Sequence, residues 1–167
     1  MAELRRWRSM WPCTDRRELV HSVRTAIAAV VSLLIGRLFK LLESYWAAIT
    51  TMIVMQSTLG AALTISKQRL AGTALGAAMG ALLGSYAGQN VALFGLGIFL
   101  SGVICAVLHM ERSAHRYAGI TLAIVMLVAR TQRAWVIAIH RFIEISLGIV
   151  VGLLLTAVWP ESQPTAS

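Results

Sequence analysis

The feature that most constrains this chain is the grouping of its charged residues into short clusters, with long apolar stretches between them. Only 13% of the residues are charged, 57% are hydrophobic, and the mean hydropathy is +0.73. A soluble domain needs more polar surface to cover its core. A membrane-spanning helix instead needs about 20 mostly apolar residues, because a charge at the centre of the bilayer is costly. The sequence therefore predicts an all-α membrane protein, a bundle of about six transmembrane helices.

The six apolar stretches are bounded by the charged clusters, and each is a predicted span. They are residues 23–42, 45–64, 70–88, 91–108, 117–129 and 134–159. The fifth is short because Arg116 and Arg130 bound it, so it must tilt little, thin the bilayer, or let its flanking arginines reach back to the membrane surface. The chain accordingly divides into a basic interfacial leader (1–22), a transmembrane module (23–160) and a short polar tail (161–167).

The net charge of +8 raises the question of nucleic-acid binding, and the positions of the charges argue against it. No basic face with interleaved aromatic residues is visible, so the expected partner is the lipid bilayer and not a nucleic acid. Six of the 15 Lys and Arg residues lie in the leader or at the very start of the first span. Placing Lys67 and Arg69 in a loop on the same side, with Arg112 and Arg116, gives ten basic residues there against four on the other side. The positive-inside rule then predicts that both termini are cytoplasmic.

Nothing in the sequence points to catalysis or to a bound metal. The four histidines lack metal-ligand spacing, and there is no phosphate-binding loop and no consistent Ser-His-Asp arrangement. Cys13 lies in the leader and Cys105 in a predicted span, so both are expected to remain reduced thiols. We therefore expect neither enzyme activity nor a cofactor.

Glycine recurs at every fourth residue along the third predicted span. The series is Gly72, Gly76, Gly80, Gly84 and Gly88. Successive members are separated by about 400° around a helix, so they form one shallow groove without side chains. Such a groove allows a neighbouring helix to approach closely. We interpret this face as a helix-packing seam, with the lining of a conduit as the alternative.

The two halves of the chain contain an internal repeat. Residues 48–55 match residues 119–126 at five of eight positions, at an offset of 71. At an offset of 72 the matching pairs are Arg69 with Arg141, Gly76 with Gly148, and Gly80 with Gly152. Each half would hold three spans, and an odd number reverses the second half in the membrane, a construction common among transporters. The pattern predicts two inverted three-helix repeats and a second packing seam on the last span.

Ionisable and polar residues inside the predicted spans are the candidates for a substrate path, because such residues normally face the bundle interior or water. Arg141 and Glu144 are three residues apart on one helix face. They form either a mutually satisfied structural pair or a site where Arg141 attracts an anion. Arg69, followed by Thr73 one turn later, is either an interfacial anchor or an anion contact. Gln56 adds a polar group to the second span, where interhelical hydrogen bonding is the default role.

A set of motifs along the chain is shared with a known family of membrane proteins. The motifs are Tyr45-Trp46-Ala47-Ala48-Ile49-Thr50, Gln56, Gln68-Arg69-Leu70-Ala71-Gly72-Thr73 with Gly76 and Gly80, Arg116-Tyr117-Ala118, Arg141-Phe142 with Glu144 and Gly148, and Trp159-Pro160. They resemble the fusaric acid resistance (FUSC), or aromatic acid exporter, family over nearly the whole chain, roughly residues 24–160. The resemblance implies a six-helix module of the bacterial inner membrane that exports aromatic or other organic acid anions.

Larger members of that family carry two such modules and cytoplasmic helical domains, whereas this chain shows one module. The resemblance therefore implies a homodimer or a higher homo-oligomer, with a separate efflux subunit as another possible partner. We predict a transport module in which Arg69 and Arg141 supply positive potential along the path of a small organic anion. The alternative is a non-transporting membrane component, or a partner subunit of a larger efflux assembly.

Overall fold

The computed structural model describes residues 16–41, 43–55, 58–87, 90–127 and 133–159, and these ranges are helical apart from short connections. The helices are α2 (Arg16–Leu38), α3 (Tyr45–Val54), α4 (Leu59–Ala87), α5 (Val91–Val107), α6 (Arg112–Leu127) and α7 (Ala134–Val158). The prediction of an all-α chain is confirmed over the described residues. Among them, two helices are long and apolar enough to cross a membrane: α2 from Leu19 onward, and α7. The helices α3 and α5 are apolar but shorter.

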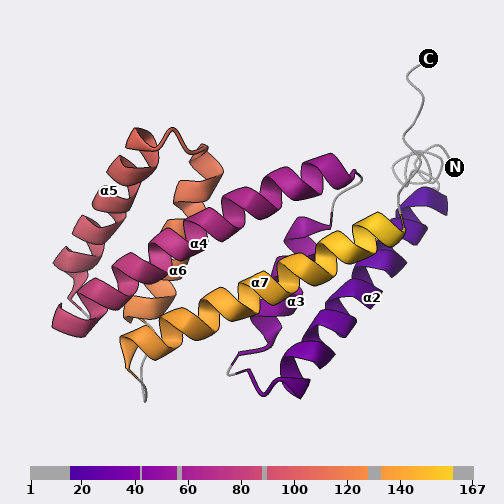
Figure 1. Ribbon diagram of the computed structural model, residues 1–167, viewed down its shortest axis with the longest axis horizontal. Helices are drawn as coiled ribbons and strands as arrows, with labels where there is room; N and C mark the ends of the chain where they lie inside the picture. The colour runs from indigo at the N-terminus through magenta and orange to yellow at the C-terminus, as the bar shows by residue number, and fades with distance from the viewer. Residues whose placement is uncertain (1–15, 42, 56–57, 88–89, 128–132, 160–167) are drawn as a thin grey trace, which may run out of the picture.

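The two longest helices, α4 and α7, form the centre of the molecule and run antiparallel to each other (Figure 1). The α5–α6 pair lies beside α4, and the α2–α3 pair lies beside α7 (Figure 1). The closest packing joins α4 to α6, α4 to α7, and α3 to α7. Each central helix therefore packs on a pair of helices from the opposite half of the sequence.

The glycine seam of α4 packs directly on the backbone of α6. A Cβ atom at Gly72 would lie 2.2 Å from the carbonyl oxygen of Ala114. One at Gly76 would lie 2.2 Å from the carbonyl oxygen of Ala118. No side chain fits at these distances, so glycine is what allows the two backbones to touch.

Farther along α4 the backbones of α4 and α6 are less close to each other. A Cβ atom at Gly80 would lie 2.9 Å from the side chain of Val125 on α6. Gly84 is half-buried, and Gly88 lies outside the described residues. The close approach of α4 to α6 is therefore concentrated in the first half of the glycine series.

A second seam joins α7 to α3. A Cβ atom at Gly148 would lie 2.4 Å from the carbonyl oxygen of Ala47, and Gly152 faces the side chain of Val54. The hydroxyl of Thr51 is 2.9 Å from the carbonyl oxygen of Ala47 and 3.0 Å from that of Gly148. A polar contact thus reinforces the place where these two backbones meet.

The predicted boundary between the second and third spans is wrong. Helix α3 ends at Val54, after ten residues, and Met55 is extended with φ −61° and ψ 103°. Helix α4 begins at Leu59, where the hydroxyl of Thr58 accepts the amide hydrogen of Ala61 at 3.2 Å. A threonine oxygen at this position satisfies one of the free amides of a first helical turn, so Thr58 begins a new helix.

The loop expected around Lys67 and Arg69 does not exist, because α4 runs through both residues. The stretch 61–71 contains neither glycine nor proline, so nothing in it interrupts a helix. The predicted polar residue Gln56 lies outside the described residues. The other boundaries agree better: α5 and α7 begin where predicted, α6 begins five residues earlier, and α2 begins within the predicted leader.

The helices α2 and α5 end in the same kind of turn. Lys40 and His109 both have φ 52°, in the left-handed region. In each turn the next amide donates to the carbonyl five residues back, at 3.1 Å after Lys40 and 2.9 Å after His109. This hydrogen bond is that of a Schellman motif, which satisfies a carbonyl of the last helical turn.

Candidate functional site

Two buried arginines, one from each half of the chain, meet at a small cavity between α3, α4, α6 and α7. Arg69 is 5% exposed and Arg141 is 3% exposed, although 72 positions separate them in the sequence. Trp46, Thr73 and Tyr117 line the same cavity. Its volume is about 10 Å³, which is about the room that one ordered water needs. The cavity is thus closed to an organic acid in this conformation.

Arg69 projects from α4, and its hydrogen-bond and ring partners among the described residues are uncharged. Its Nε and Nη2 atoms donate to the hydroxyl oxygen of Thr50 at 3.3 and 3.1 Å. Its Cζ atom lies 4.9 Å from the ring centroid of Tyr117. No carboxylate of the described residues forms an ion pair with it. A buried guanidinium without a counter-ion is unfavourable, so Arg69 leaves an uncompensated positive charge beside the cavity.

Arg141 projects from α7 and has two carboxylate partners. Its Nη2 atom forms an ion pair with Oε2 of Glu43, in the turn before α3. Its Nη1 atom lies 3.5 Å from Oε2 of Glu144, one turn along α7. Its Cζ atom lies 4.4 Å from the ring centroid of Trp46. Unlike Arg69, Arg141 is electrically compensated.

The two carboxylates are bound in different ways. Oε2 of Glu43 accepts hydrogen bonds from the Tyr45 hydroxyl at 2.8 Å and from Nε1 of Trp46 at 3.0 Å, besides its contact with Arg141. Oε1 of Glu144 accepts the backbone amide of Glu43 at 2.8 Å. Glu144 is 1% exposed, whereas the Glu43 side chain is 35% exposed. Glu43 therefore connects the cluster to the surface.

The two arginine–aromatic contacts are equivalent in sequence as well as in geometry. The two arginines are 72 positions apart, and Trp46 and Tyr117 are 71 positions apart. These are the offsets of the sequence repeat. Arg69 of the first half lies over the ring of Tyr117 in the second half. Arg141 of the second half lies over the ring of Trp46 in the first half.

The structure brings together four of the five predicted path residues: Arg69, Arg141 and Thr73 line the cavity, and Glu144 contacts Arg141. The fifth, Gln56, lies outside the described residues. Glu43 was missed as a functional residue, because a charged residue between two apolar stretches is typical of a membrane surface. Its position two residues before the Tyr45-Trp46 motif is the one signal that could have identified it.

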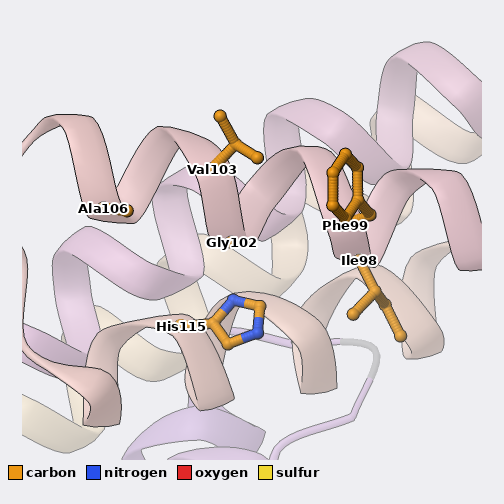
Figure 2. A pocket seen from close by; sticks show the side chains of 6 residues that line it. All are labelled: Ile98, Phe99, Gly102, Val103, Ala106 and His115. Atoms are coloured by element: carbon orange, nitrogen blue, oxygen red, sulfur yellow. The ribbon is translucent and has the colours of Figure 1, made fainter.

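A second hollow lies at the surface between α5 and α6. Figure 2 shows His115 of α6 directed toward Gly102 of α5, with Phe99 and Ile98 farther along the same helix. The volume is about 310 Å³. The lining is apolar except for His115, whose Nδ1 atom has no hydrogen-bond partner. Because it lacks a charged group, this hollow is a poor site for an organic anion.

The described residues contain no group of three His, Cys, Asp or Glu side chains placed to hold a metal ion. The site is therefore defined by its charges: one uncompensated arginine and one arginine shared by two carboxylates, both lining a closed cavity. Such an arrangement can attract and orient an anion.

The chain matches one protein family and several bacterial relatives. A family described as fusaric acid resistance protein-like matches residues 27–155. The uncharacterized transporter YdhK of Escherichia coli K12 is 28% identical over 152 residues, covering 86% of this chain and 23% of YdhK. The inner membrane protein YeeA of the same organism is 30% identical over 152 residues, covering 86% of this chain and 41% of YeeA. The chain thus spans less than half the length of either relative. No solved structure matches it.

Proposed function

Because this chain belongs to the fusaric acid resistance protein-like family, as its motifs predict, we propose that it is a membrane transport module for small organic anions. The proposal includes aromatic acids among its substrates and the bacterial inner membrane as its location. It also includes a cytoplasmic location for both termini. Lys67 and Arg69 lie within α4 and no longer count as inner-loop residues. The predicted inner side then has eight basic residues and the outer side has four, so the positive-inside rule continues to favour this orientation.

The outer surface supports a position within the bilayer for all six helices. Large apolar side chains are exposed on the outer faces of α2, α5 and α7; examples are Leu34 at 57%, Phe99 at 66% and Leu154 at 59%. Soluble proteins rarely expose apolar surface on this scale, and lipid would cover it. Helix α3 has ten residues, a length of about 15 Å, so it crosses only part of a hydrocarbon layer of about 30 Å.

Three paired features support two inverted three-helix repeats. The glycine seam of α4 packs on α6, and that of α7 packs on α3. Each buried arginine lies on the aromatic ring of the opposite half. The turns after α2 and α5 each contain one residue in the left-handed conformation and the same type of hydrogen bond. In transporters built this way, substrates bind where the repeats meet, and the cavity lies at that place.

The observation that carries the proposal is the buried, uncompensated charge of Arg69. A carboxylate or sulfonate that entered the cavity would supply the counter-ion that Arg69 lacks. Thr73 would offer a hydroxyl nearby, and the rings of Trp46 and Tyr117 would flank an aromatic substrate. Arg141 is already paired with Glu43 and Glu144, so we assign it a secondary role in attracting the anion.

Transport requires the closed cavity to open. One exposed lining residue indicates the side of the molecule on which it would open. Ile120 of α6 lines the cavity and is 50% exposed, so the cavity lies close to the molecular surface. We propose that a second copy of the chain, or a separate efflux subunit, covers this face. Relative movement of the two halves, or of the two copies, would then open the path.

Flux from liposomes tests the proposal. Purified chain is reconstituted, the vesicles are loaded with benzoate, and its release is followed in wild type, Arg69→Gln and Arg112→Gln. Arg112 is an exposed arginine on α6 and serves as the matched control. We expect Arg69→Gln to abolish release and Arg112→Gln to retain it. Equal release from all three proteins would contradict the role of Arg69. An inactive wild-type oligomer would contradict autonomous transport and favour the partner-subunit alternative.

A further inference from the structure

The charges around Arg141 do not balance. One guanidinium faces two carboxylates, so the cluster of Glu43, Arg141 and Glu144 carries one net negative charge when all three groups are ionised. Arg141 is 3% exposed and Glu144 is 1% exposed. An excess charge at these two buried side chains is unfavourable, and a bound proton is the simplest way to remove it.

The other titratable and charged groups around the cluster lie on or next to α2, α4, α6 and α7. His140 lies one helical turn before Glu144 on α7, and its Nδ1 atom lies 2.9 Å from the carbonyl oxygen of Val136. From α4 and α6, Arg69 and Tyr117 face the cavity beside Arg141. At the end of α2 that precedes Glu43, the basic residues Arg37 and Lys40 are both exposed. None of these side chains forms an ion pair with Glu144 among the described residues.

The two carboxylates differ in how well their ionised forms are stabilised. Oε2 of Glu43 accepts three hydrogen bonds, from Arg141, Tyr45 and Trp46. Glu144 accepts one backbone amide on Oε1. Its Oε2 atom lies 3.5 Å from Nη1 of Arg141, an atom that has no hydrogen-bond partner. Hydrogen bonds to a carboxylate favour its ionised form, so Glu144, with fewer of them, is the carboxylate better placed to take up a proton.

We propose that Glu144 is a proton-binding site, protonated reversibly on Oε2 while Glu43 and Arg141 remain a one-to-one ion pair. The 35% exposed side chain of Glu43 connects the cluster to water and provides the route for the proton. Resting on the proposed function, the site also couples protons to anions. An ionised Glu144 adds negative charge beside the cavity and occupies one edge of Arg141, and protonation relieves both effects. Proton binding and anion binding therefore favour each other.

Infrared spectroscopy of the purified full-length chain in detergent tests the proton site without any substrate. Above about pH 6.5, exposed carboxyl groups are almost fully ionised, so a protonated-carboxyl C=O band there reports a buried acid. We expect such a band in wild type and in His140→Gln, the matched control on the same helix. We expect Glu144→Gln to remove it and Glu144→Asp to retain it at a shifted frequency. A wild type without the band, or a band that Glu144→Gln leaves unchanged, would overturn the proposal.

Anion binding measured against pH separates this inference from the proposed function. Benzenesulfonate is a suitable probe, because it stays ionised throughout the range and any pH dependence belongs to the protein. We expect its affinity to rise as the pH falls in wild type and to be independent of pH in Glu144→Gln. If the infrared band is present and no anion binds at any pH, the proton site stands and the anion function fails. If the anion binds with one affinity at every pH, the coupling is refuted and the anion function stands.

Discussion

Replacing Gly76 by alanine is the most direct perturbation of the packing that forms the cavity. The new Cβ atom would lie 2.2 Å from the carbonyl oxygen of Ala118 and 2.9 Å from its Cα atom. Ordinary contacts begin at 3.4 Å, and the obstructing atoms belong to the backbone. Helices α4 and α6 must therefore separate by roughly 1 Å at this point, since no side chain can rotate away.

The energetic consequence follows from two opposing effects. Overpacking of this kind costs about 1–3 kcal/mol, and a gap of this width forfeits about a quarter to a half of each dispersion contact along the seam. Alanine in place of a helical glycine gains about 0.5–1 kcal/mol. We expect Gly76→Ala to lower the free energy of unfolding by about 1–2 kcal/mol after this offset.

Unfolding by sodium dodecyl sulfate in mixed micelles measures the effect, with far-ultraviolet circular dichroism as the signal. Gly60→Ala and Gly95→Ala are matched controls, because no atom lies within 4 Å of a Cβ at either position. Both should leave the midpoint unchanged or raise it. If Gly76→Ala behaves like these controls, α4 and α6 do not touch as described and the argument from the glycine seam is refuted.

Three other substitutions test separate contacts by the same unfolding measurement. Thr51→Val removes the hydroxyl between α3 and α7 and should cost about 0.6–2 kcal/mol; an unchanged midpoint would mean that the hydroxyl adds nothing to the seam. Thr58→Ala removes the cap of α4 and should cost about 1 kcal/mol, whereas a neutral result would argue for a helix continuous through residues 55–58. Arg141→Gln leaves two carboxylates without their partner and should cost about 3–5 kcal/mol. Adding Glu144→Gln to it should restore part of that loss, and a further loss in the double variant would contradict the excess of negative charge.

The helical class and the ends of several helices could be predicted because apolar length and charge positions determine them locally. The boundaries of α5 and α7 follow from clear charge or turn signals at their ends. The packing role of the glycines on α4 and α7 could also be predicted, because a four-residue period implies a smooth helix face. What the period could not specify was the partner of each seam, since packing of α4 on α6 depends on the whole bundle.

The break between α3 and α4 was missed because hydropathy stays high across residues 52–65, so the threonine cap gives a weaker signal than the apolar content around it. Arg69 was placed in a loop because Lys67 lies beside it, although Lys67 is exposed and Arg69 is buried on the same helix. Glu43 was missed for a different reason. Its partner Arg141 is 98 positions away, and such a contact has no local signal.

The central claim is that Arg69 binds an organic anion at the cavity between the two halves, and equilibrium binding of benzenesulfonate tests it most directly. Isothermal titration of the purified full-length chain at one pH should give saturable binding in wild type and in Arg112→Gln. A charged hydrogen bond is worth about 1.5–3 kcal/mol, so Arg69→Gln should weaken binding by about 10- to 150-fold. Binding by Arg69→Gln with wild-type affinity would contradict the account.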